Sequence, residues 1–290
     1  MIIVTGATGQ LGRRIVEQLL RRVPADQVGV SVRDPEKARV FAERGVRVRS
    51  GSFTDPASLA QAFEGASQVL VVSVDKLGDE AVEQHRVAIE AAATAGARRI
   101  VYTSHMGANP SSHFVATRDH AATEELLRAS GVPFTSLRNG FYATSVLQFM
   151  GPALETGKIV LPEDGPVSWT THADLAEAAA VVLTDENRFD GPTPPLTATE
   201  AVDFDRVAAI ASELTGKTIT RVTVGDDDYR ASLVEHGVPE PAVDVLLGIF
   251  AASRAHEFAA VDTTLTTLLG RPPASLEAFV RDEIANDAKV

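Results

Sequence analysis

The sequence has no cysteine, which excludes disulfide bonds, thiolate metal sites and cysteine nucleophiles. Its apolar runs all fall short of the roughly 20 residues that a helix needs to cross a membrane. Basic residues are in the minority, with 27 Lys and Arg against 39 Asp and Glu and a formal net charge of −12. Because a surface of this charge repels phosphate backbones, we expect no nucleic-acid partner.

The chain of 290 residues opens on an apolar strand pattern, Ile2-Ile3-Val4, so we expect no signal peptide before the fold. Its length allows one large domain, or a domain with a smaller lobe. A hydrophobic content of 44% is typical of a soluble protein with a buried core. These features predict a cytoplasmic protein without a membrane partner.

The first half of the sequence alternates short β-branched runs with segments of helical periodicity. Repeated strand–helix units require right-handed crossovers, so they predict an α/β fold with a doubly wound, parallel Rossmann-type sheet. The expected strands are Ile2–Thr5, Val28–Val32, Val46–Arg49, Val69–Ser73, Arg99–Ser104 and Phe134–Leu137.

This rhythm breaks after Asn139-Gly140, where prolines interrupt the chain. We expect residues 1–140 to form the dinucleotide-binding domain and to receive a further strand from about 190–200. Residues 141–290 are expected to form a smaller C-terminal α/β substrate lobe, interleaved with the first domain. The helices expected there are Ala173–Leu183, Phe204–Leu214, Pro241–Ala252 and Leu276–Ile284, with strand candidates at Ile159–Leu161 and Ile219–Val224.

Three glycines with the spacing G-x-x-G-x-x-G follow the first strand and open the first helix. Glycine allows the backbone to approach a pyrophosphate, and the helix N-terminus offers N–H groups and partial positive charge to that anion. The pattern therefore predicts a dinucleotide-binding loop rather than an ordinary tight turn. Its expected cofactor-binding residues are Gly6, Thr8, Gly9, Gln10, Leu11 and Gly12.

The end of the second strand distinguishes NADP(H) from NAD(H). An NAD-binding protein carries Asp or Glu there, about 20 residues past the loop, to bind the ribose hydroxyls. Here Arg33 stands at the strand end, and Asp34-Pro35 has the pattern of a helix cap. A guanidinium at this place suits a 2′-phosphate, and Lys37 adds a second charge one turn later. We predict NADP(H), with a solvated strand end as the alternative interpretation of Arg33.

Four segments together resemble the NmrA-like atypical short-chain dehydrogenases/reductases: T-G-A-T-G-Q-L-G, V-R-D-P-E-K-A, I-V-Y-T-S and S-L-R-N-G-F-Y. Within that family the chain is most similar to the NADPH-dependent quinone oxidoreductases, with triphenylmethane reductase as a relative. The resemblance implies that Ser73 lies along the ribose and that Thr103 and Ser104 lie beside the nicotinamide. It also implies that one further segment closes over the carboxamide end: Leu137, Arg138, Asn139, Gly140, Phe141 and Tyr142.

Standard members of the superfamily carry a Tyr-x-x-x-Lys pair for proton transfer, and this chain does not. Ala116 stands at the tyrosine position and His120 at the lysine position. His120 can hydrogen-bond the ribose or relay a proton, although a histidine on a helix is often structural. With Ser104 and Tyr142, it completes the set of catalytic candidates. We expect no metal site, since the histidines show no ligand spacing.

The absence of the Tyr-Lys pair narrows the class of acceptor that the protein can reduce. A ketone needs a proton as charge builds on its oxygen, whereas a quinone spreads that charge over a conjugated ring. The sequence therefore favours an NADPH-dependent oxidoreductase that passes hydride to a quinone or similar conjugated acceptor. The alternative is a redox sensor of NmrA type that binds NADP(H) without turnover. Phe141, Tyr142 and Trp169 are either a wall for a flat acceptor or ordinary core. The sequence does not decide whether the chain forms a homodimer.

Overall fold

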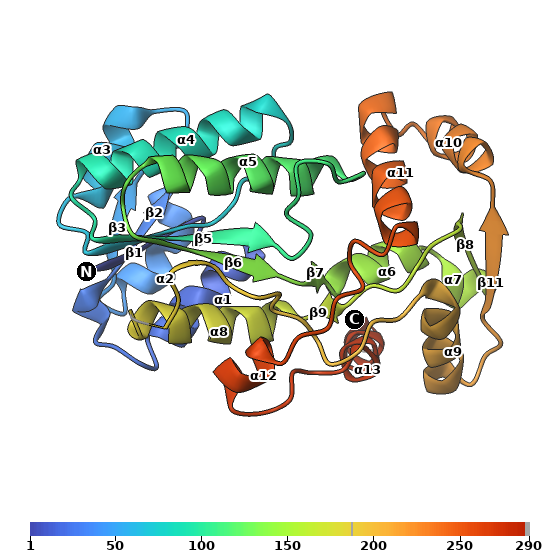
Figure 1. The fold of residues 1–290 in the computed structure, drawn as a ribbon. Helices are drawn as coiled ribbons and strands as arrows, with labels where there is room; N and C mark the ends of the chain where they lie inside the picture. The colour runs from blue at the N-terminus through green and yellow to red at the C-terminus, as the bar shows by residue number, and fades with distance from the viewer. Residues whose placement is uncertain (187, 288–290) are drawn as a thin grey trace.

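The computed structural model describes residues 1–186 and 188–287 of the chain (Figure 1). Seven parallel strands form the central sheet in the order β10-β6-β5-β4-β1-β2-β3. From β1 the sheet extends to both sides, through β4, β5 and β6 on one side and through β2 and β3 on the other. The doubly wound Rossmann-type fold predicted from the sequence is therefore confirmed. The strands are β1 Ile2–Thr5, β2 Val28–Val32, β3 Arg47–Ser50, β4 Gln68–Val71, β5 Arg99–His105, β6 Phe134–Asn139 and β10 Gly191–Pro192.

Helices cover both faces of the sheet, with α3, α4 and α5 on one face and α1, α2 and α8 on the other (Figure 1). Because both faces are covered, the central strands are buried along almost their whole length. The helices of these two layers are α1 Gln10–Leu19, α2 Arg39–Ala42, α3 Pro56–Phe63, α4 Asp79–Thr94, α5 Val115–Ala129 and α8 His172–Thr184.

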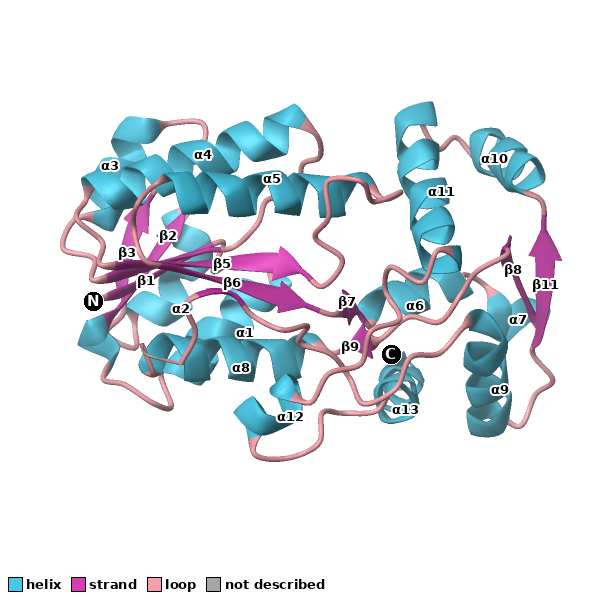
Figure 2. Cartoon of the chain, viewed as in Figure 1, coloured by secondary structure: helices cyan, strands magenta, loops and turns pink. Residues whose placement is uncertain are grey.

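A smaller lobe lies beyond the carboxyl ends of β5 and β6 (Figure 2). It holds two short parallel strand pairs, β8 with β11 and β7 with β9, and its own apolar core. Its strands are β7 Phe141–Tyr142, β8 Lys158–Pro162, β9 Trp169–Thr170 and β11 Thr220–Val224. The remaining helices are α6 Thr144–Met150, α7 Ala153–Thr156, α9 Phe204–Thr215, α10 Asp226–Glu235, α11 Glu240–Arg254, α12 Thr264–Leu269 and α13 Leu276–Asp287.

Two strand ends differ from the sequence prediction for a reason that bears on function. β4 stops at Val71 instead of Ser73, because the next two N–H groups bond to side chains rather than to a neighbouring strand. Val72 N–H donates to Thr5 Oγ1 at 2.9 Å, and Ser73 N–H donates to Thr103 Oγ1 at 2.8 Å. β6 runs on to Asn139, since that residue still pairs with the end of β5. Four helices, α6, α7, α10 and α12, were not predicted at all.

Within the described ranges, no helix combines the length and the apolar character that crossing a membrane requires. Short 3-10 turns at Ala25–Gln27 and Pro35–Ala38 complete the first half of the chain.

Candidate dinucleotide and acceptor site

The first βα turn has the shape that a pyrophosphate-binding loop requires. Gly6, directly after β1, has a φ of 61°, in the left-handed region that side chains resist. A Cβ on Gly12 would lie 2.3 Å from the Gly6 carbonyl oxygen, so only glycine allows helix and loop to come this close. The Gly9 N–H donates to the same carbonyl at 3.0 Å and closes the turn. The glycine spacing therefore has a physical cause at its first and third positions.

The N-terminus of α1 is open to an anion. Among the residues that the structure describes, no side chain caps this helix, and its first turn has no acidic residue. The first N–H groups of a helix lack intrahelical partners and carry partial positive charge. Thr8, Gly9 and Gln10 are exposed at this end, whereas the Leu11 side chain is buried in the core. The loop and helix end together fit the pyrophosphate of a dinucleotide.

Two cations follow β2 and are exposed. Arg33 and Lys37 make no side-chain hydrogen bond or ion pair within residues 1–186 and 188–287. The neighbouring Asp34 is occupied, because its Oδ1 accepts the Glu36 N–H at 3.1 Å and caps the next 3-10 turn. The guanidinium of Arg33 is thus available to a phosphate at the strand end, while the adjacent carboxylate serves the backbone.

Hydroxyl groups converge where β1, β4 and β5 end. Thr103 Oγ1 accepts the Ser73 N–H and donates to Ser73 Oγ at 3.3 Å. Thr103 is buried and Ser73 is half-buried. In an open α/β sheet, ligands bind outside this carboxyl edge, and the structure brings Ser73 and Thr103 to the same edge as Gly6.

Ser104 and Arg138 share a buried partner on α5. The Ser104 hydroxyl donates to Glu124 Oε1 at 2.7 Å, so its proton is directed into the protein. Arg138 holds the same carboxylate with two bonds, Nε to Oε1 at 3.1 Å and Nη2 to Oε2 at 2.6 Å. Glu124 itself is only 3% exposed. This network ties the ends of β5 and β6 to α5, and the catalytic role predicted for Ser104 stays a prediction.

Tyr142 lies over His172, with ring centroids 4.2 Å apart and planes at 36°. Burial raises the pKa of Tyr142 and lowers the pKa of His172 to about 4. Within the described residues, His172 Nδ1 and Asn139 Oδ1 are buried without a hydrogen-bond partner. Because an unsatisfied buried polar atom is costly, these two atoms mark a place where a ligand can supply the missing bonds.

The positions of the missing Tyr-Lys pair have other neighbours here. Ala116 packs against the core of the lobe. His120 is half-buried, and its Nδ1 lies 2.7 Å from the hydroxyl of Tyr102 on β5. Burial and the nearby rings of His105 and His85 hold the pKa of His120 well below its usual value. His120 is therefore neutral at pH 7, paired with a tyrosine from a strand instead of its own helix.

A second imidazole lies beside His120. The His105 ring stacks on it, with centroids 6.1 Å apart and planes at 21°. Burial lowers the pKa of His105 to about 4, so this ring is neutral as well. The ring of His105 also touches three phenylalanines edge-on, at 5.4 to 6.5 Å between centroids. Those three phenylalanines are Phe114, Phe141 and Phe258.

Several other residues that were predicted to line the site are buried in the core and are not exposed at the carboxyl edge of the sheet. Leu137 is fully buried in the sheet core, and Phe141 packs against Trp169 in the core of the lobe. Trp169 is 2% exposed and donates to the Val202 carbonyl, which fits the core interpretation. A Cβ on Gly140 would lie 2.2 Å from Thr170 Oγ1, so this glycine permits the junction of β6 and β7 to approach β9 closely.

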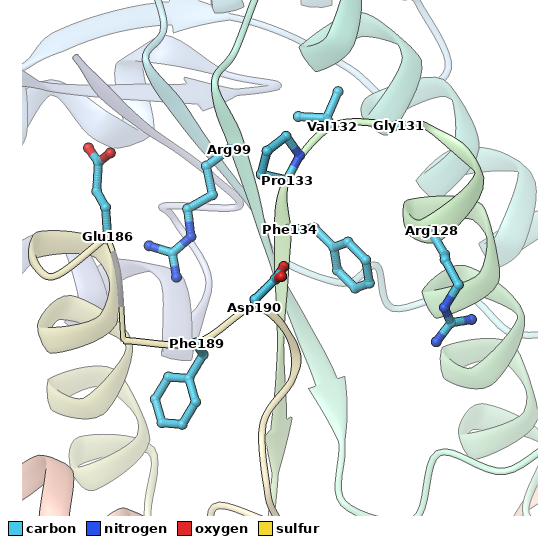
Figure 3. Close-up of a pocket in the computed structure, with 9 residues that line it drawn as sticks. All are labelled: Arg99, Arg128, Gly131, Val132, Pro133, Phe134, Glu186, Phe189 and Asp190. Carbon is cyan, nitrogen blue, oxygen red and sulfur yellow. The ribbon is translucent and has the colours of Figure 1, made fainter.

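Figure 3 shows a pocket at the opposite end of the sheet, where β5 and β6 begin. Its buried Arg99 donates to the Val182 carbonyl at 3.0 Å and to Thr135 Oγ1 at 2.8 Å. These bonds hold α8 and β6 together. Because the pocket lies away from the glycine loop, we assign it no part in the dinucleotide site.

Comparison with known proteins identifies the family. The NmrA-like family matches residues 1–270. The chain belongs to the NmrA-like family. Quinone oxidoreductase 2 of Escherichia coli is 35% identical over 281 residues, 97% of each chain. The structure of the NADPH-dependent quinone oxidoreductase from the same organism, complexed with NADPH, superposes with a TM-score of 0.92 at 34% identity and covers 98% of this chain and 99% of that one.

Two more relatives of this NmrA-like chain extend the comparison. Citrobacter sp. triphenylmethane reductase, complexed with NADP(H), has a TM-score of 0.90 at 35% identity, covering 97% of this chain and 99% of that one. The NAD(P)H azoreductase of Xenophilus azovorans is 28% identical over 287 residues, 98% of each chain. These matches confirm the family that the sequence motifs indicated.

The sequence did not reveal Tyr102, His85 or His172 as members of the site. Tyr102 lies inside an apolar strand pattern and reads as core. His85 lies on α4, and only the fold brings its ring near Tyr102, with 5.2 Å between ring centroids. His172 follows Thr171 at the start of α8, and nothing in its spacing connects it to Tyr142. Tyr102 is a polar residue in an otherwise apolar strand, whereas His85 and His172 lie in polar stretches that carry no such signal.

Proposed function

We propose that this member of the NmrA-like family is an NADPH-dependent oxidoreductase that passes hydride to a quinone or similar conjugated acceptor. The observation that carries the cofactor assignment is the pairing of an uncapped α1 N-terminus with Arg33 one strand away, whose side chain has no partner among residues 1–186 and 188–287. The first suits a pyrophosphate and the second a 2′-phosphate. The relatives described with NADPH or NADP(H) support the same assignment.

The residues present fit this cofactor. Gly6 through Gly12 would hold the pyrophosphate, and Arg33 with Lys37 the 2′-phosphate. Ser73 and Thr103 would lie along the ribose, with Asn139 Oδ1 as a buried acceptor at the far end. When bound, NADPH supplies the hydride, and the protein would position its nicotinamide.

The acceptor class rests on what stands in place of the Tyr-Lys pair. Ala116 has no proton to give, the Ser104 proton is directed at Glu124, and the half-buried Tyr142 keeps its proton because its pKa is raised. A substrate that needs full protonation in the transition state is poorly served by these groups. A quinone or an extended cationic dye needs less, which agrees with the quinone, dye and azo reductases among the relatives.

The test measures NADPH oxidation, through the loss of nicotinamide absorbance, with a panel of quinones, enones, imines and cationic dyes. We expect turnover with the conjugated acceptors and little with simple ketones. Tight NADPH binding without turnover on any acceptor would refute the oxidoreductase assignment and leave the redox-sensor interpretation.

A further inference from the structure

We propose that His105 and His120 are a pair of Nε2–H donors that hydrogen-bond a carbonyl oxygen of the acceptor, with Tyr102 as the positioning residue that fixes the orientation and tautomer of His120. The inference rests on the proposed function and narrows its substrate class. It assigns the site to acceptors that carry a carbonyl oxygen, quinones above all, in preference to dyes that have none.

The tautomer of each imidazole follows from its neighbours, beginning with His85. The Val74 N–H donates to His85 Nε2 at 3.1 Å, so the proton of this neutral ring is on Nδ1. His85 Nδ1 then donates to Thr123 Oγ1 at 2.9 Å, and the Thr123 hydroxyl donates to the Asp119 carbonyl at 2.8 Å. A donor, not an acceptor, therefore faces Tyr102 Oη from His85, at 3.5 Å.

The shortest hydrogen bond of the Tyr102 hydroxyl is the one to His120 Nδ1, at 2.7 Å, and the Thr123 hydroxyl is a further neighbour. If Tyr102 donates to Nδ1, the single proton of neutral His120 is on Nε2. His105 reaches the same state independently, because its Nδ1 accepts the Gly107 N–H at 3.0 Å. We assign both rings as Nε2–H tautomers.

Both Nε2 atoms are available to a ligand. Within the described residues neither makes a hydrogen bond, and neither is among the side-chain atoms sealed from solvent without a partner. The two rings are stacked, and His105 is backed by the buried rings of Phe114, Phe141 and Phe258. His105 pairs in register with Asn139, so the donors lie at the carboxyl edge of the sheet where the cofactor residues gather.

A neutral donor suits the reduction of a quinone. Hydride from NADPH brings two electrons and one hydrogen, which turns the quinone into a hydroquinone monoanion and NADPH into NADP⁺. The negative charge develops on oxygen, so a fixed N–H donor binds the transition state more tightly than the substrate. Water supplies the proton that completes the hydroquinone, and both imidazoles keep theirs. A cationic triphenylmethane dye loses its charge on accepting hydride and develops no oxyanion.

The first measurement is nitrogen NMR of the histidine-labelled wild-type protein, with and without NADPH. We expect His105 and His120 to show a protonated Nε2 and a bare Nδ1 at pH 7. A protonated Nδ1 on His120 would overturn the assignment of Tyr102. In Tyr102→Phe, which keeps the ring and removes the hydroxyl, we expect the His120 signals to move toward a mixture of tautomers, whereas unchanged signals would contradict the positioning role.

The second measurement compares kcat/KM for menadione and for malachite green, a cationic triphenylmethane dye. We expect His120→Phe to lower the quinone-to-dye ratio about 100- to 1,000-fold, the range for loss of one oxyanion donor. His120→Gln, which keeps an N–H donor, should recover part of the ratio. His236→Gln changes an exposed histidine directly after α10, is the matched control and should leave the ratio unchanged.

The outcomes separate the two proposals. A wild-type protein that reduces neither acceptor refutes the proposed function together with the donor role. If the wild type reduces both acceptors and His120→Phe lowers both rates equally, the donor role is wrong and the oxidoreductase assignment stands. Reduction of the dye alone also overturns the preference for a carbonyl oxygen.

Discussion

Replacing Arg33 with alanine tests the 2′-phosphate assignment. Arg33 is exposed and has no carboxylate partner within the described residues, so its removal breaks no internal ion pair. A charge-assisted contact of this kind contributes about 1.5–2 kcal/mol at an exposed site. At about 1.4 kcal/mol per factor of ten, Arg33→Ala should weaken NADPH binding roughly 10- to 30-fold. Lys37 is a more mobile point charge, and Lys37→Ala should cost only about 2- to 5-fold.

The assay is isothermal titration of each variant with NADPH and with NADH at two salt concentrations. NADH lacks the 2′-phosphate, so its affinity should change little in Arg33→Ala. The preference for NADPH should shrink at high salt, because exposed charges are screened. Arg21→Ala, another exposed arginine at the other end of α1, is the matched control. Equal losses of NADPH and NADH affinity in Arg33→Ala would show that Arg33 does not bind the 2′-phosphate.

Three further predictions concern stability and are read from chemical denaturation. Gly12→Ala, whose Cβ meets the Gly6 carbonyl at 2.3 Å, should cost about 1–3 kcal/mol, whereas Gly9→Ala, with a contact at 3.4 Å, should cost far less; equal costs would argue against the close approach. Glu124→Ala leaves Arg138 without its buried partner and should cost about 3 kcal/mol, and a neutral result would show that the network is dispensable. Burial lowers the pKa of His85 to about 4, against about 6.5 in the unfolded chain, so the unfolded state binds more protons as pH falls between these values. The wild type should therefore lose about 2–3 kcal/mol more than His85→Gln between pH 7 and pH 4.5, and equal losses would contradict this cause.

The sequence was sufficient to predict the sheet and the glycine loop because both depend on local patterns. β-branched runs and helical periodicity predicted six strands of the sheet within two residues at each end, and the glycine spacing predicted the turn that Gly6 and Gly12 form. The cap at Asp34 was equally local, since Asp34-Pro35 determines it without any distant contact. β10 is only two residues long and depends on pairing with β6, so the sequence indicated its region and not its bounds.

The chemistry of the acceptor side could not be predicted in the same way. Ser104 was expected beside the nicotinamide, and only packing against α5 shows that its proton goes to Glu124. The sequence placed His120 at the lysine position of the superfamily's Tyr-x-x-x-Lys pair, whose tyrosine lies on the same helix. In the structure its partner is Tyr102, which lies on a strand 18 residues earlier. Such contacts depend on which elements meet in space, and neither periodicity nor spacing along the chain reports them.

The central claim, that this chain transfers hydride from NADPH to a conjugated acceptor, is tested most directly by a single anaerobic turnover. The protein is loaded with stoichiometric NADPH and mixed with a quinone, and nicotinamide absorbance and hydroquinone are followed together. We expect one hydroquinone to appear for each NADPH consumed, with a slower reaction when the transferred hydrogen is deuterium. Bound NADPH that stays reduced in the presence of the quinone would contradict the claim.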